Sequence, residues 1–179
     1  MKNIYVVTGG PGFGKTSLID ELRKKGFNGG KELSRGFIHG QMVNGGKFLP
    51  WVNRLGYSEI MLRKRIKQYG RTPRDQIWLF DRGIPDLIAY IIKDGFEVPS
   101  FYYEAAEEYR YNDVVFFTPP WKEIYKNDSE RKESFEEAER IHNEIKRVYQ
   151  LLDYDCVDIP KEPIEKRTEF VLNKINSIN

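Results

Sequence analysis

The sequence of 179 residues has little of several features that would assign it to a particular class of protein. Its single cysteine, Cys156, cannot form an internal disulfide, so we expect a reducing compartment, the cytoplasm. The two histidines, His39 and His142, lack the partners and spacing of a metal site. No apolar run approaches the roughly 20 residues of a membrane-spanning helix. The net charge of +2 is too small to indicate nucleic acid or a membrane surface as a partner.

What is present fits one ordinary globular domain. Hydrophobic residues make up 40% of the chain and charged residues 31%, and the length suits a single core. We find no internal repeat, low-complexity tract or linker, and therefore expect one domain over residues 1–179. Aromatic residues reach 14%, which is compatible both with packing and with stacking on a flat ligand.

Glycine is concentrated near the start, where residues 4–16 read IYVVTGGPGFGKT. The apolar run at 4–7 is typical of a strand that is buried on both faces. Residues 17–25 carry apolar side chains at helical spacing, and Gly26 is a natural helix stop. The glycines therefore join a strand to the N-terminus of a helix.

Gly9, Gly14, Lys15 and Thr16 fit the pattern G-x-x-x-x-G-K-[ST]. Glycines allow successive backbone N–H groups to point into one concavity, and the helix N-terminus adds partial positive charge. In such a loop the lysine reaches the β- and γ-phosphates, and the hydroxyl of Thr16 binds Mg²⁺. We predict an ATP-binding loop formed by Gly9, Gly10, Pro11, Gly12, Phe13, Gly14, Lys15, Thr16 and Ser17.

A second apolar run at 77–80 delivers an acid, Asp81, at its end within the stretch QIWLFDRGIPD. Ligands of open α/β sheets bind at the carboxyl ends of the strands, so Asp81 is placed to hold Mg²⁺ or to act as a base. A turn or helix-capping role for Asp81 is the alternative.

Further strands are expected at 113–118 and 154–159, each followed by proline, and a short one within 27–31. Helical patterns alternate with these strands, so we predict the α/β class: a three-layer P-loop fold in which helices flank a parallel sheet of about five strands. The expected helices span residues 51–69, 85–93, 102–111, 129–152 and 164–178.

Basic residues gather within 54–74, and we interpret them as the solvated face of a helix, although a partner surface is an alternative. They are Arg54, Arg63, Lys64, Arg65, Lys67, Arg71 and Arg74.

Several stretches together resemble one family, the P-loop proteins of the AAA-domain type described as predicted ATPases. They look kinase-like, and the chain is similar to the nicotinamide riboside kinase domain of bifunctional NAD-biosynthesis regulators. It is more distantly similar to deoxynucleoside and thymidylate kinases. The resemblance covers almost the whole chain through TGGPGFGKTSL, KELSR, LFDRGIPDLIAY, VVFFTPPWKEIYKNDSERKESFEEAERIH and IPKEPIEKRTEFVL.

The resemblance implies roles on the acceptor side. Glu32 and Arg35 match a Glu-x-x-Arg motif that faces the phosphate acceptor. Asp81, Arg82 and Asp86 match a D-R-G-x-x-D element, in which the first acid serves Mg²⁺ or deprotonates the acceptor and the arginine positions acceptor or phosphate. Either Glu32 or Asp81 would be the base.

The resemblance also implies a lid formed by residues 121–140 and a loop that lies beside the adenine ring of the nucleotide. Asp128 and Arg131 match the lid segment, whose arginine closes over the phosphates and would act in catalysis with Lys15. Pairing of Arg131 with an acid on its own helix is the alternative. Pro160 and Lys161 match the loop that usually borders the adenine.

These expectations favour a Mg²⁺-dependent kinase that transfers the γ-phosphoryl group of ATP to a small nucleoside-like or other hydroxyl acceptor. An ATPase or nucleotide-dependent switch acting on a macromolecular partner is the alternative. A GTPase is disfavoured, because the nearest match to the guanine motif N-K-x-D is NKIN at 173–176, which lacks the aspartate.

Overall fold

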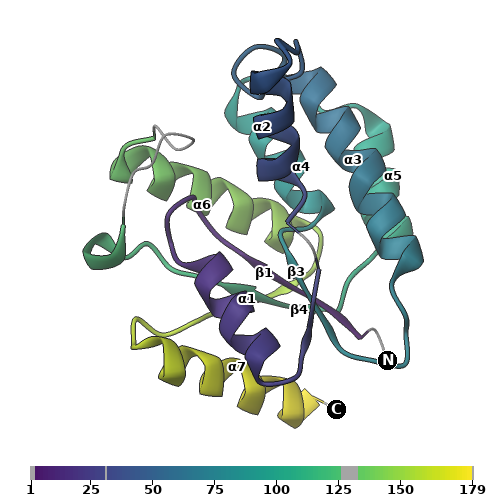
Figure 1. The fold of residues 1–179 in the computed structure, drawn as a ribbon. Coiled ribbons are helices and arrows are strands. Elements are labelled where there is room, and N and C mark those ends of the chain that lie inside the picture. Colours follow the sequence, from purple (N-terminus) through teal and green to yellow (C-terminus); the bar gives the residue numbers. More distant parts are fainter. Residues whose placement is uncertain (1–2, 31, 126–132, 179) are drawn as a thin grey trace.

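The computed structural model describes residues 3–30, 32–125 and 133–178. A sheet forms its centre (Figure 1). It has five strands in the order β2-β3-β1-β4-β5. All neighbouring strands are parallel, as the alternating pattern predicted. The strands are β1 (Ile4–Thr8), β2 (Asn28–Gly29), β3 (Trp78–Asp81), β4 (Val114–Phe117) and β5 (Asp155–Asp158).

Helices cover both faces of the sheet, because alternate side chains of its buried strands point to opposite sides. Tyr5 and Val7 pack with α1 (Lys15–Lys24) and α7 (Ile164–Ile178), which lie together beneath the sheet in Figure 1. Ile4 and Val6 belong to the larger core on the other face. That face carries α3 (Arg54–Arg71), α4 (Ile84–Lys93), α5 (Ser100–Glu108) and α6 (Phe135–Leu151). The three-layer α/β fold that the sequence predicted is confirmed.

One helix was not predicted. The segment after β2 forms α2 (Ser34–Val43), which contributes no fully buried residue. It contains Gly36 and Gly40, and glycine weakens a helical signal because of its low helix propensity. Phe37 of α2 contacts Tyr57 of α3, with ring centroids 6.0 Å apart. Packing against α3 therefore supports a helix that its own sequence favours little.

Two predicted helices begin later than expected, each at a capping side chain. Asn53 Oδ1 accepts a hydrogen bond from the Gly56 N–H at 2.9 Å, so α3 begins at Arg54 instead of Trp51. Ser134 Oγ accepts one from the Glu137 N–H at 3.2 Å and caps α6 at Phe135. A short 3₁₀ helix, Lys122–Ile124, lies between β4 and α6.

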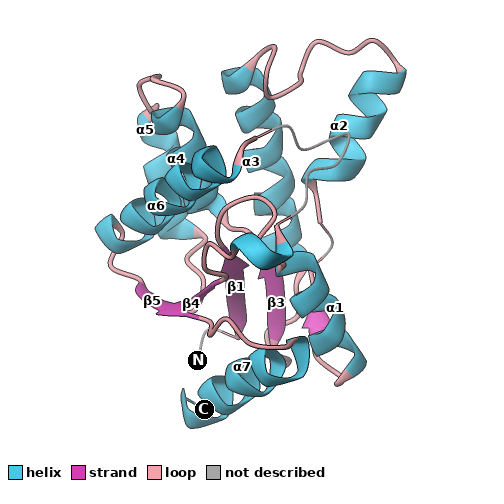
Figure 2. Cartoon of the chain, turned by 90° about the vertical axis from the view of Figure 1, so that its left-hand side faces the viewer, coloured by secondary structure: helices cyan, strands magenta, loops and turns pink. Residues whose placement is uncertain are grey.

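The central strands place two chain segments at one edge of the sheet. β1 and β3 are neighbours, and Val7 pairs with Asp81 at their carboxyl ends. The loop from β1 to α1 and the turn after β3 therefore emerge side by side (Figure 2). Within the described residues, no helix has the length and apolar character needed to cross a bilayer.

Candidate functional site

The loop between β1 and α1 has the backbone conformation of a phosphate cradle. Gly9, Gly12 and Gly14 have φ angles of 131°, 83° and 79°, in the range that side-chain-bearing residues rarely adopt. A Cβ on Gly9 would lie 2.5 Å from the carbonyl oxygen of Thr118, so the chains approach too closely for a side chain. Lys15 is buried, and its Nζ donates to the Gly10 carbonyl at 2.7 Å and to the Gly9 carbonyl at 3.2 Å. The Lys15 side chain is thus folded back onto the main chain of the loop between β1 and α1.

A cavity of about 170 Å³ lies against this loop and collects most of the predicted site residues. Asp81 and Arg82 from the end of β3 face it, as do Glu32 and Arg35 from the segment after β2. The loop lines its other side with Pro11, Gly12, Gly14, Lys15, Thr16 and Ser17. Three segments that are far apart in the sequence therefore meet where the motif predicts a polyphosphate.

Oxygen donors in this cavity suit a hard divalent cation. The exposed Thr16 and the half-buried carboxylate of Asp81 line the same space. Among the described residues, no group of three or more His, Cys, Asp or Glu side chains forms a metal cage. Two protein oxygens combined with substrate phosphates is the arrangement that Mg²⁺ prefers, so these residues fit that ion.

Arg82 has an unusual backbone conformation for a residue with a side chain. Its φ of 65° lies in the left-handed region, which persists only where the surroundings fix it. Arg65 of α3 supplies part of that support: its Nη1 donates to the Arg82 carbonyl at 2.6 Å and to the Asp81 carbonyl at 3.3 Å. The buried side chain of Arg65 thus fixes the main chain of Asp81 and Arg82, both of which are predicted site residues.

The Arg82 side chain is held by Asp86, whose Oδ1 accepts a hydrogen bond from Arg82 Nη1 at 2.8 Å. Asp86 also accepts hydrogen bonds from Thr8 Oγ1 at 2.5 Å, from the Gly83 N–H at 2.8 Å and from the Tyr149 hydroxyl at 2.8 Å. Burial by itself would raise the pKa of Asp86, but the positive charge of Arg82, together with the other donors, lowers it. Asp86 is 1% exposed and its carboxylate holds the Arg82 side chain, while its contact with an acceptor stays a prediction.

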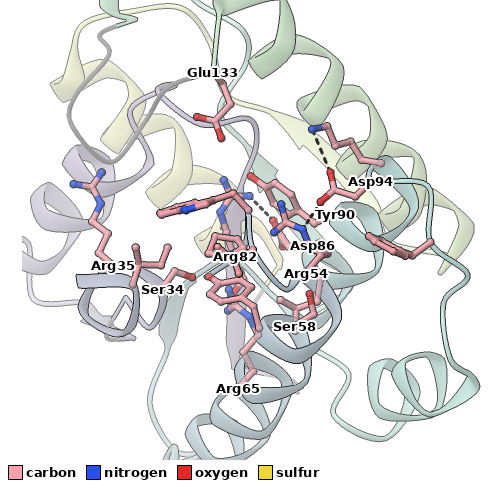
Figure 3. Close-up of a pocket in the computed structure, with 18 of the residues that line it drawn as sticks. Ser34, Arg35, Arg54, Ser58, Arg65, Arg82, Asp86, Tyr90, Asp94 and Glu133 are labelled. Atoms are coloured by element: carbon pink, nitrogen blue, oxygen red, sulfur yellow. Dashed lines mark hydrogen bonds and ion pairs between the residues drawn. The ribbon is translucent and has the colours of Figure 1, made fainter. Parts of the chain in front are cut away.

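A second, much larger cavity of about 930 Å³ adjoins the first, and both are lined by Glu32, Arg35 and Arg82. Figure 3 shows Arg82, Tyr90 and Arg54 gathered at its centre. Apolar side chains form part of its wall: Ile38, Met42, Trp51, Val52, Leu87 and Phe96. Its volume lies in the range of sites for drug-sized molecules.

The larger cavity includes polar residues that the sequence did not identify. Arg54 and Arg82 both lie against the Tyr90 ring, with their guanidinium carbons 5.2 and 5.4 Å from its centroid. Arg54 also forms an ion pair with Asp94. The prediction that the basic residues within 54–74 form a solvated face is therefore wrong for Arg54 and for Arg65, which is 3% exposed.

A signal for Arg65 was present in the sequence. It follows Met61 by four positions and Leu62 by three, so it lies on the apolar stripe of α3. A single arginine on such a stripe indicates a buried partner, here the carbonyls of residues 81 and 82. Arg54 lies at the first position of α3 and carried no comparable pattern.

Glu32 and Arg35 form a loose ion pair, with Oε1 and Nε 3.4 Å apart. Burial raises the pKa of Glu32, the negative charge of Asp81 raises it further, and Arg35, Arg82 and Lys15 oppose the change. A carboxylate with a raised pKa at the junction of two cavities can accept a proton from a bound hydroxyl group.

Two sets of predicted residues that the structure describes do not line these cavities. Within the described part of the chain, Pro160 and Lys161 follow β5 without lining either one, so their contact with adenine stays a prediction. Asp128 and Arg131 lie outside the described residues. Gly9, Gly10 and Phe13 of the loop are buried and line neither cavity.

The profile of the AAA domain family matches residues 4–167. Among solved structures, deoxyadenosine kinase from M. mycoides with bound dATP superposes with a TM-score of 0.64 at 16% identity, covering 97% of this chain and 99% of that one. Thymidylate kinase from Ehrlichia chaffeensis gives 0.66 at 16% identity, covering 98% of each chain. The NadR protein in complex with NR gives 0.66 at 18% identity, covering 98% of this chain but 50% of that one. No curated protein sequence matches. At these identities the structural likeness shows the fold, that of the P-loop kinases.

Proposed function

Because the chain belongs to the AAA domain family, and because two adjoining cavities share three charged residues, we propose that it is an ATP-dependent phosphotransferase. The reaction is transfer of the γ-phosphoryl group of ATP to a hydroxyl group of a small, nucleoside-like acceptor. The observation that carries this proposal is the junction of the cavities at Glu32, Arg35 and Arg82. A switch that only hydrolyses ATP needs no second enclosed space beside its phosphate loop.

The smaller cavity would hold the triphosphate. The backbone amides of the loop and the ammonium group of Lys15 surround its β- and γ-phosphates, and Thr16 with Asp81 would hold Mg²⁺. When bound, Mg²⁺ neutralises charge on the phosphate oxygens. Lys15 leaves the Gly10 carbonyl when a phosphate oxygen becomes available, because an ion pair replaces a neutral acceptor.

Arg82 would align the reacting groups at the junction. Its guanidinium group is fixed by Asp86, and its main chain by Arg65. A cation held in place before the substrate binds stabilises the charge on the transferring group with little reorganisation. Positioning of this kind supplies most of the catalysis in phosphoryl transfer.

Glu32 is the better placed of the two candidate bases, because it lines both cavities whereas Asp81 lines the smaller one. In the reaction, a bond forms between the acceptor oxygen and the γ-phosphorus, and the bond from that phosphorus to the β–γ bridging oxygen breaks. ADP leaves with the bond's electron pair, and Glu32 takes the hydroxyl proton.

The wall of the larger cavity supports a nucleoside-like acceptor. Trp51, Val52 and Met42 are 59%, 63% and 51% exposed, and each lines this space. A ligand with a flat apolar part would cover these side chains, while its hydroxyl group faced Glu32 and Arg82. The similar structures include a deoxyadenosine kinase, a thymidylate kinase and a protein with bound NR, which supports the same class of acceptor.

The test is ADP release with ATP and Mg²⁺ across a panel of nucleosides, deoxynucleosides and nicotinamide riboside. We expect at least one acceptor to stimulate turnover and to yield a phosphorylated product by mass spectrometry. Trp51→Ala should raise the KM for that acceptor and leave its KM for ATP unchanged. Phe101→Ala, which removes an exposed aromatic side chain of α5, is the matched control.

If no acceptor stimulates turnover, and a macromolecular partner instead accelerates ATP hydrolysis, the kinase proposal fails and the switch alternative replaces it. Binding of that partner would then have to differ between the ATP and ADP states.

A further inference from the structure

Arg167 of α7 is a buried cation for which the described part of the chain supplies no acidic partner. It is 4% exposed, and among the described residues no carboxylate forms an ion pair with it. Its Nε has no hydrogen-bond partner, and its Nη2 donates to the Phe13 carbonyl over 3.5 Å, at the limit of a hydrogen bond. Burial lowers the pKa of this guanidinium group, and no charge among the residues that the structure describes opposes that effect.

The position of Arg167 connects it to the phosphate loop. A Cβ on Gly14 would lie 3.0 Å from Arg167 Nη1 and 3.3 Å from Nη2, so the guanidinium group packs directly on the loop backbone. On its other side it approaches the Trp121 ring, with its guanidinium carbon 5.9 Å from the centroid. The cation is thus held against the main chain of residues 13 and 14.

Two other arginines of the site have firm partners. The buried Arg65 donates to the carbonyls of Asp81 and Arg82 at 3.3 and 2.6 Å. Arg82 is balanced by the fully buried Asp86. An unbalanced buried charge is expensive, because the protein interior replaces water poorly. A buried guanidinium group beside a loop that gathers backbone N–H groups indicates that its counter-ion arrives with the ligand.

We infer that Arg167 is a positioning residue of the phosphate loop, whose counter-ion is the polyphosphate of the bound nucleotide. It braces residues 13 and 14 from outside the cavity, and its charge adds to that of Lys15 and the helix N-terminus. This inference rests on the proposed nucleotide binding. It assigns the polyphosphate, and not the adenine ring, as the part of the nucleotide whose binding Arg167 supports.

The inference predicts opposite effects on binding and on stability. Arg167→Met keeps an unbranched apolar stem and removes the charged guanidinium group, so affinity for both ATP and tripolyphosphate should fall by roughly tenfold, by the same factor. The melting temperature without ligand should be unchanged or higher, because an unbalanced buried charge has been removed. Arg167→Lys should lose less affinity than Arg167→Met. Lys166→Met, which removes an exposed charge from the same helix, is the matched control and should bind as the wild type does.

Isothermal titration calorimetry with ATP and with tripolyphosphate, together with thermal melting, distinguishes the outcomes. If Arg167→Met has a lower affinity for ATP but binds tripolyphosphate as the wild type does, Arg167 supports binding of the adenine ring and the inference is wrong. If it lowers the melting temperature without ligand and leaves both affinities unchanged, the residue is only structural and the inference is also wrong. If the wild type binds neither ligand, the proposed function itself fails. Should Arg167→Met not fold, Arg167→Gln, which also removes the charge, takes its place, and wild-type affinity of that variant for both ligands overturns the inference.

Discussion

Arg82 Nη1 lies 2.8 Å from Asp86 Oδ1, an ion pair between a strained residue after β3 and a fully buried carboxylate in the first turn of α4. The Tyr149 hydroxyl of α6 donates to the other oxygen of Asp86 at 2.8 Å. The orientation of the Arg82 side chain toward the acceptor cavity therefore depends on α6, a helix that begins more than 50 residues later in the sequence.

Breaking this ion pair should cost both stability and activity. Asp86→Asn leaves Arg82 charged and without its counter-ion, and we expect a loss of about 3–5 kcal/mol in the free energy of unfolding. Tyr149→Phe removes one hydrogen bond to a charged group and should cost about 2 kcal/mol. Urea unfolding measures both changes. Equal stability of Asp86→Asn and the wild type would contradict the assigned role of this carboxylate.

Lys15 should be required for nucleotide binding but not for folding. Lys15→Ala removes the cation that the loop holds over Gly9 and Gly10, so affinity for ATP should fall by about tenfold to hundredfold. Thermal melting should show little or no stabilisation by ATP, with the far-ultraviolet circular dichroism unchanged. Lys24→Ala, at the exposed end of α1, is the control. A wild-type response of Lys15→Ala to ATP would contradict the phosphate-loop assignment.

The pH dependence of turnover should report Glu32. Because burial and Asp81 raise its pKa, the acid limb of kcat/KM should lie above the ordinary range of a glutamate. Activity is then lost as the pH falls through the Glu32 pKa, since the protonated acid cannot accept the hydroxyl proton. Glu32→Gln should lower turnover by roughly 100-fold or more and abolish that limb. An unchanged limb in Glu32→Gln would transfer the role of base to another group.

His142 should make the protein less stable in mild acid. Burial lowers its pKa to about 4, against 6.5 for an ordinary histidine, so the unfolded chain takes up a proton first as the pH falls. Stability should therefore decrease between pH 6.5 and 4, by up to about 3 kcal/mol from this residue. His142→Phe keeps an aromatic ring beside Phe117 and should flatten the curve, whereas the exposed His39→Gln should not. If the free energy of unfolding of His142→Phe and of the wild type fell equally between pH 6.5 and 4, the assigned role of His142 would be wrong.

Gly12 should tolerate no side chain. Its φ is 83°, and a Cβ would lie 2.5 Å from the Tyr125 ring. Gly45 also has a positive φ, of 63°, but faces open space, so Gly45→Ala should cost only the backbone strain of about 1–2 kcal/mol. Gly12→Ala should be clearly more destabilising in urea and should also weaken ATP binding. If Gly12→Ala and Gly45→Ala destabilised the protein equally, the Tyr125 ring would have moved away from the new Cβ at little cost in stability.

The sequence alone determined the phosphate loop, the presence of the strands and most helices, because these depend on local rules. Glycines followed by Lys15 and Thr16 specify a backbone conformation over a few residues, and apolar periodicity specifies an element within one segment. It also placed Asp81 correctly beside the loop, since strands that are parallel and adjacent end at the same edge.

Tertiary structure decided what no local rule contains. α2 forms against α3, Arg65 reaches the carbonyls of a distant turn, and Arg167 packs on Gly14 from the last helix. Each contact joins segments that the chain separates widely, and the sign of a charge in the sequence does not reveal whether its partner is water, a carboxylate or a main-chain oxygen. Burial decides that question, because a cation that water can solvate needs no partner, whereas one that the fold encloses requires it.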